Sequence, residues 1–141
     1  MGLDHPKWKW LFLLALGAIA PWLYIYIQAY WALLLVPIGQ FLGVTGKTQM
    51  AVHIAAMNLC GAFIAAALLS LPLGYVVRTR AYGFGALLSL APLTVLFWYR
   101  HDEWDATGYL IAIQIAEYLN VVIAFVSMAQ LGAYLRTKVE T

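Results

Sequence analysis

Charge is the property that this sequence has least of. Its 141 residues include eight basic and six acidic side chains, or 10%, against roughly 25% in soluble domains. Apart from Glu117, every charged residue lies at a break between long apolar runs. A soluble domain spreads charge over its exposed faces, whereas the hydrocarbon core of a bilayer excludes charge at a cost of about 3 kcal/mol or more per group. We therefore predict an all-α integral membrane protein.

Other residue types are scarce too, and each scarcity excludes a class of chemistry. The single cysteine, Cys60, excludes an intrachain disulfide, and three histidines are too few for a histidine-rich di-iron centre. There is no glycine-rich phosphate loop or Ser/His/Asp arrangement at one depth, and the net charge of +2 forms no stripe that could follow a nucleic acid. His53, Met57 and Cys60 share a helix face of soft ligands, but this is more typical of packing than of a copper site. We expect no catalytic residue, no metal, no cofactor and no nucleic-acid partner.

The long uncharged runs predict four transmembrane helices in a single domain, residues 1–141. A helix needs about 20 apolar residues to cross the hydrocarbon. The expected spans are approximately 10–31, 49–71, 82–99 and 108–135. Residues 32–46 contain one proline and three glycines, so we expect an interfacial or re-entrant segment there rather than a further span. A five-span alternative, with a break near Pro21, stays open.

Basic residues in short loops predict the orientation. With four spans and both termini in the cytoplasm, six basic residues lie inside: Lys7, Lys9, Arg78, Arg80, Arg136 and Lys138. The outer loops then hold only Lys47 and Arg100. This bias follows the positive-inside rule and predicts a multi-pass protein of a cell inner membrane with cytoplasmic termini.

A few polar side chains interrupt the spans, and they define the candidate site. Glu117 and Asn58 are expected near the middle of the membrane, with Gln28 and Thr94 nearer the outer mouth. An acid within a span marks a functional site by default. The predicted proton or ligand pocket consists of Glu117, Asn120, Gln114, Asn58 and His53.

The spacing on the fourth span predicts which way Glu117 points. Glu117, Asn120, Ala124 and Ser127 recur every three or four residues and so share one small, polar helix face, whereas Phe125 points elsewhere. Such a face packs against other helices, because lipid offers it no hydrogen bonds. A small residue at Gly83 or Gly85 is expected to allow close helix approach as well.

Two classes of function stay open. The first is non-enzymatic contact within the membrane, as a subunit, assembly factor or inhibitor of a larger membrane complex; the absence of catalytic groups and soluble domains favours it. The second is a proton- or cation-coupled transporter or channel for a small solute, homo-oligomeric and dependent on Glu117. The expected partners are the lipid bilayer and either a membrane protein or further copies of this chain. A membrane enzyme is a distant third.

Overall fold

The protein folds as four α-helices. The structure is a computed structural model that describes residues 6–41, 43, 46–100 and 108–140; some side chains near the α1–α2 and α3–α4 junctions lie outside that description. The helices are α1 (Pro6–Phe41), α2 (Gly46–Val77), α3 (Ala81–Arg100) and α4 (Gly108–Val139). Each is long and apolar enough to cross a membrane. The prediction of an all-helical bundle of four such helices is confirmed.

Proline does not interrupt these helices. Pro21 and Pro37 lie within α1, and two further prolines, Pro72 and Pro92, lie within α2 and α3. In an apolar environment a continuous helix satisfies the backbone internally, and neighbouring helices tolerate the missing proline donor. The break near Pro21 that the five-span alternative required is therefore wrong. Residues 32–41 continue α1 as helix.

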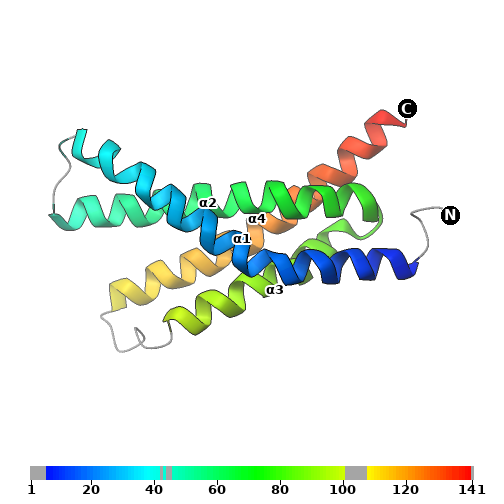
Figure 1. The fold of residues 1–141 in the computed structure, drawn as a ribbon, viewed down its shortest axis with the longest axis horizontal. Coiled ribbons are helices and arrows are strands. Elements are labelled where there is room, and N and C mark those ends of the chain that lie inside the picture. Colours follow the sequence, from blue (N-terminus) through cyan, green and yellow to red (C-terminus); the bar gives the residue numbers. More distant parts are fainter. Residues whose placement is uncertain (1–5, 42, 44–45, 101–107, 141) are drawn as a thin grey trace.

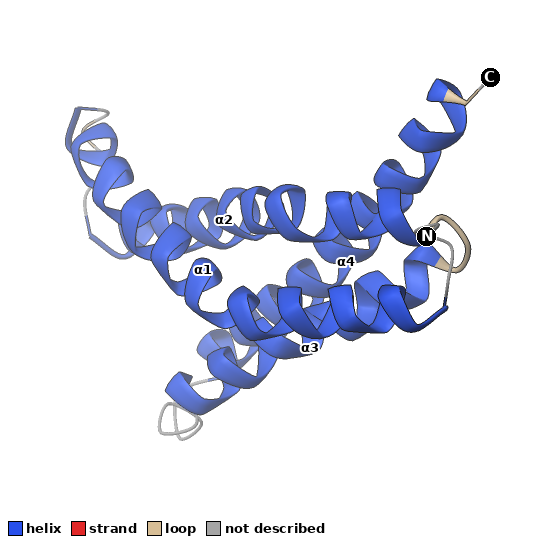
Figure 2. Cartoon of the chain, turned by 45° about the vertical axis from the view of Figure 1, so that its right-hand side comes forward, coloured by secondary structure: helices blue, strands red, loops and turns tan. Residues whose placement is uncertain are grey.

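The central element of the bundle is α2, which packs against all three other helices and most extensively against α4. Half of its most apolar segment is buried, compared with 17% in α1, which contacts α2 and α3 from one side. Both termini and the α2–α3 turn lie at one end of the molecule (Figure 1). The last turns of α4 extend away from the other helices at this end (Figure 2).

Small residues bring the backbones of α2 and α4 into direct contact. A Cβ added at Gly74 would overlap the backbone of Ala129, with its Cα only 2.7 Å away, and one at Gly132 would overlap the carbonyl of Leu71. The Ser70 hydroxyl donates a buried hydrogen bond to the carbonyl of Phe125 in the same interface. Glycine is required here because helix association in lipid depends on close van der Waals approach.

α3 approaches α4 in a similar way. A Cβ at Gly85 would lie 2.7 Å from the Phe125 carbonyl oxygen and 2.8 Å from the Ala129 Cβ, whereas one at Gly83 would meet nothing within 4 Å. The expectation of close approach at this pair of glycines therefore holds for Gly85 alone. Gly83 serves as an unhindered position on the same helix.

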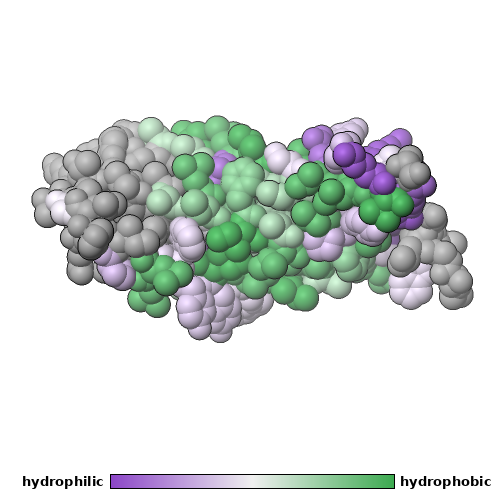
Figure 3. Space-filling view, turned by 90° about the horizontal axis from the view of Figure 1, so that it is seen from above, coloured by the Kyte–Doolittle hydropathy of each residue, from purple (hydrophilic) through white to green (hydrophobic). Residues whose placement is uncertain are grey.

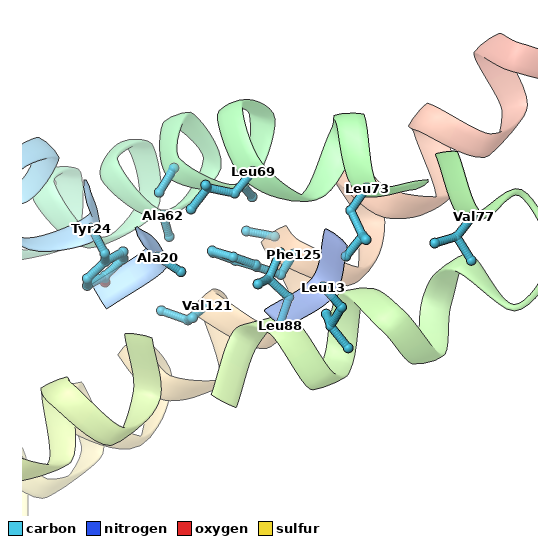
Figure 4. Packing of buried hydrophobic residues seen from close by; sticks show 13 residues of the cluster. Leu13, Ala20, Tyr24, Ala62, Leu69, Leu73, Val77, Leu88, Val121 and Phe125 are labelled. Atoms are coloured by element: carbon cyan, nitrogen blue, oxygen red, sulfur yellow. The ribbon is translucent and has the colours of Figure 1, made fainter. Parts of the chain in front are cut away.

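The core runs along the middle of the bundle, where side chains from all four helices meet (Figure 4). α2 contributes the largest share of it, at intervals of three and four residues that form one continuous face. The largest fully buried side chains are Tyr24, Phe125, Leu73 and Leu88. Much of the remaining surface is apolar: in Figure 3 the middle of the molecule is hydrophobic and hydrophilic residues gather at one end.

At that hydrophilic end, basic side chains of neighbouring helices donate hydrogen bonds to the last carbonyls of α2. Arg136 Nη1 donates to the carbonyls of Tyr75 and Val76 at 3.3 and 3.2 Å, and Lys9 Nζ donates to that of Val77 at 3.2 Å. The last carbonyls of a helix have no partner within it and carry partial negative charge, which cations neutralise. Three helices are thereby joined at this end.

Glu140 completes the same cluster. Its carboxylate lies 2.8 Å from Arg136 Nε and 2.7 Å from Arg78 Nη1. The hydrogen bond from Arg136, together with the charges of Arg78 and Arg136, holds the pKa of Glu140 below its ordinary value of 4.5. The backbone of Arg78 adopts a left-handed conformation in the turn, with φ 60°. Residues other than glycine adopt this conformation at a cost of about 1 kcal/mol.

Candidate functional site

The polar residues of α4 that the sequence singled out are buried. Gln114 is 4% exposed and Glu117 is 3% exposed. They begin a buried stripe that continues at intervals of three and four residues through Val121, Ala124 and Phe125. The stripe faces the bundle because it contains the positions that pack against α2 and α3. Glu117 therefore points into protein.

The face that carries Glu117 differs in part from the expected one. Ser127 is exposed, and Phe125, which was expected to point elsewhere, is fully buried. These two expectations are wrong because packing, rather than polarity, sets the orientation of α4. Its backbone lies against Gly74 of α2 and Gly85 of α3, where the carbonyls of Ala129 and Phe125 come closest. Glu117 and Ala124 belong both to the expected polar face and to the buried face that the structure shows.

The contacts between α2 and α4 give the level of Glu117 in the bundle. The two helices run in the same direction, and the contacts Ser70–Phe125 and Gly74–Ala129 both join residues 55 positions apart. If this offset continues along the two helices, we infer that Glu117 lies at about the level of Ala62. Ser70 and Gly74 are four residues apart and so belong to one ridge of α2. Ala62 is fully buried and lies on the same ridge, two turns before Ser70.

The contacts between α1 and α2 bring two further polar residues to this level. These helices are antiparallel: Trp31 Nε1 donates to the Ala56 carbonyl at 3.3 Å, and the amide of Gln28 lies against Gly61. Gln28 therefore sits one residue from the level of Glu117. Tyr24 is one turn before Gln28, and Figure 4 shows Tyr24, Ala62 and Val121 toward the same end of the labelled core cluster.

We call Tyr24, Gln28, Gln114 and Glu117 the polar layer. Tyr24 is 1% exposed, and its hydroxyl accepts a hydrogen bond of 2.9 Å from Gln28 Nε2. Gln28 Oε1 is buried and accepts no hydrogen bond from the residues that the structure describes. The layer thus gathers a carboxyl group, two amides and a phenol inside an apolar bundle.

Gly61 makes room for this arrangement. A Cβ at that position would lie 3.0 to 3.2 Å from the three terminal atoms of the Gln28 side chain. Such contacts are tighter than nine in ten real ones, so a larger residue would shift the amide by a few tenths of an ångström. Gly61 is therefore part of the site although it carries no functional group.

The polar layer lies near the middle of α2. Gly61 is 15 residues after Gly46 and 16 residues before Val77, the two ends of this helix. The depth of Glu117 in a membrane stays a prediction.

The other predicted site residues are placed as follows. Asn120 is half-buried on α4. The backbones of Asn58 and His53 lie in α2, but their side chains are outside the described part of the structure. Thr94 is exposed and donates to carbonyls of its own helix, at 2.7 and 2.8 Å, so it is not part of the layer. Within the described residues, no three His, Cys, Asp or Glu side chains form a group that could hold a metal ion.

Sequence reasoning missed Tyr24. This residue stands four positions before Gln28 and so shares its helix face. That spacing was the available signal. Its connection to Glu117 depends on the register of α1 against α2 and of α2 against α4, which no pattern within a single helix contains.

Comparison of the chain with known protein families, curated proteins and solved structures finds no match. The molecule's own features therefore define its class. It is a four-helix bundle whose helices are compatible with a multi-pass membrane protein, and its interior contains a buried acid.

Proposed function

We propose that this chain is a multi-pass protein of a cell inner membrane that acts without catalysis, by contact with another membrane protein. It would serve as a subunit, assembly factor or inhibitor of a larger complex. Its four helices would cross the bilayer with both termini in the cytoplasm. The grouping of Lys9, Arg78 and Arg136 at the end that holds the termini supports this orientation. Residues 32–46 would lie at the outer surface or re-enter the membrane there.

The observation that carries the contact proposal is the exposed face of α1. This helix is held to the bundle by a narrow strip that includes Leu13, Ala20 and Tyr24, and the opposite side is exposed from Leu11 to Leu34 where its side chains are described. That exposed face combines small residues with large aromatic ones: Ala15, Ala18, Trp22, Tyr26 and Ala29.

This composition suits a helix of another protein better than lipid. Small residues allow a second helix to approach closely, and they are enriched where transmembrane helices meet. Tyrosine and tryptophan contribute strongly to protein interfaces because they combine a large apolar area with a polar group. The partner is therefore a transmembrane helix that packs along α1.

Site-specific photo-crosslinking in intact cells tests this proposal. A photoreactive residue at Ala18 is expected to give one discrete crosslink to another membrane protein. The matched control is Leu119, which is 58% exposed on α4 and is expected to give none. Equal yields at the two positions, or crosslinks from Ala18 only to further copies of this chain, would overturn the contact proposal.

A second function, proton- or cation-coupled transport of a small solute by a homo-oligomer, is favoured by one observation. Glu117 is buried at the start of the apolar segment Gln114–Val139, and acids in such segments are rare unless they serve an ion pathway. Flux measurements in proteoliposomes test this function. Uptake driven by an imposed ion gradient and abolished in Glu117→Gln would support it, and the absence of any ion-dependent flux would exclude it.

A further inference from the structure

The polar layer contains an unused acceptor at its centre. Gln28 Nε2 is committed to the Tyr24 hydroxyl, and Gln28 Oε1 is buried without a donor among the described residues. A buried amide oxygen that lacks a partner costs about 1–3 kcal/mol. A cation that binds beside it would remove this cost.

The remaining groups of the layer are oxygen donors as well. Glu117 supplies a carboxylate, Tyr24 a phenolic oxygen and Gln114 an amide oxygen. Oxygen ligands of this kind suit alkali and alkaline-earth ions and disfavour the transition metals that bind sulfur or imidazole. A single carboxylate balances one positive charge, and a buried excess charge is costly. The donor set therefore fits a monovalent ion.

We propose that the polar layer is a binding site for a small alkali cation, with sodium as the ligand, formed between α1, α2 and α4. Glu117 provides the charge, and the Gln28 carbonyl oxygen is a neutral ligand. Tyr24 positions that amide through its hydrogen bond. The proposal deepens the second function above by naming the ion and its ligands.

Gly61 makes the site testable without removing any ligand. Gly61→Ala would displace the Gln28 amide, since the new Cβ would lie 3.0–3.2 Å from its atoms, and would leave Glu117 in place. Gly83→Ala is the matched control, because a Cβ there meets nothing within 4 Å. Both variants exchange one helical glycine for alanine, Gly61 in the interior of α2 and Gly83 in the first turn of α3.

The experiment is thermal unfolding of the purified protein in lipid nanodiscs during titration with NaCl, with choline chloride added to keep the ionic strength constant. A ligand that binds only the folded state raises Tm in a saturable way. The wild type and Gly83→Ala are expected to share one sodium midpoint. Gly61→Ala and Gln28→Leu should raise that midpoint about tenfold or more, as the loss of supporting interactions around an ion does.

Two results would overturn the proposal. One is a wild-type Tm that responds equally to sodium and choline. The other is a sodium midpoint that is unchanged in both Gly61→Ala and Gln28→Leu. Flux assays separate this proposal from transport. Saturable sodium binding without flux keeps the site and excludes transport, whereas sodium-independent flux without a sodium-dependent Tm excludes the site alone.

Discussion

At the scale of single residues, Glu117 is an acid in the interior of an otherwise apolar bundle. Its position within an apolar run identifies it at once, and the three-and-four spacing predicts that it faces protein, as its burial now shows. The accompanying residues were less predictable. Phe125 replaces Ser127 on the buried face, and Tyr24 joins from another helix. Such assignments depend on which ridges of α4 meet the glycines of its neighbours, and this is a property of pairs of helices.

The charge state of Glu117 distinguishes a structural from an ion-binding role. Glu117→Gln keeps size and hydrogen-bonding capacity, so we expect it to fold with a Tm close to that of the wild type. Glu117→Leu is expected to lower stability by about 1–3 kcal/mol, because polar neighbours in the layer lose a buried partner. Thermal unfolding of the two variants in nanodiscs checks both statements. Equal stability of Leu and Gln variants would show that Glu117 makes no polar contact that matters.

At the scale of helices, packing is decided by glycines at three contact points, which the sequence indicated only in part. Gly85 was anticipated, whereas Gly74 and Gly132 lie within long apolar runs where nothing marks them. They can be recognised only once α2 and α4 are known to run side by side in the same direction. The same contacts explain why α2 is the centre of the bundle.

Adding a side chain at the close contact between Gly74 and Ala129 should destabilise the protein. In Gly74→Ala the added methyl group overlaps the backbone of Ala129, so the two helices must move apart. Overpacking of a well-packed interface costs about 1–3 kcal/mol, and we expect a destabilisation in this range. Gly83→Ala, which meets no neighbour, should be neutral or stabilising by up to about 1 kcal/mol. Denaturation in mixed micelles measures both, and equal effects would contradict the close contact.

The ion pairs at the basic end should make stability depend on acid pH. The pKa of Glu140 is lowered in the folded protein by Arg136 first and by Arg78. Its contribution is therefore complete above the ordinary value of 4.5 and is lost as pH falls through the lowered pKa. Glu140→Gln is expected to lower Tm slightly at neutral pH, because the pair is exposed.

Measuring Tm of the wild type and of Glu140→Gln at acid pH completes the test. Well below the lowered pKa, Glu140 is protonated and resembles glutamine, so wild type and variant should unfold at the same temperature. A difference in Tm that is constant from neutral to strongly acid pH would show that the carboxylate charge plays no part.

At the scale of the whole molecule, the sequence predicted the architecture well. The approximate ranges 10–31, 49–71, 82–99 and 108–135 each lie within one helix, because uncharged runs of that length admit few other structures. The extent of α1 was less clear, since Pro37 and the nearby glycines suggested an earlier end. α1 reaches Phe41 instead. The placement of these segments in a membrane stays a prediction.

Orientation is the first whole-molecule prediction. The proposed orientation keeps the six basic residues of the helix ends and turn in the cytoplasm. A reporter fused after Thr141 should then read internal, and one inserted after Trp104 should read external. A cysteine at Gly43 should label from the same side as one at Trp104. An N-terminal reporter inside combined with a C-terminal reporter outside would contradict the four-span topology.

The measurement that tests the central claim most directly is the composition and mass of the particle extracted from its native membrane in mild detergent. A protein that works by contact should emerge in a particle that contains a second membrane protein in fixed stoichiometry. Its mass should then differ from every multiple of the 15.7 kDa chain. The Trp22→Ala variant should be released from it, because that residue lies on the exposed face of α1. A particle that contains only this chain, at a whole-number multiple of 15.7 kDa, would contradict the contact account.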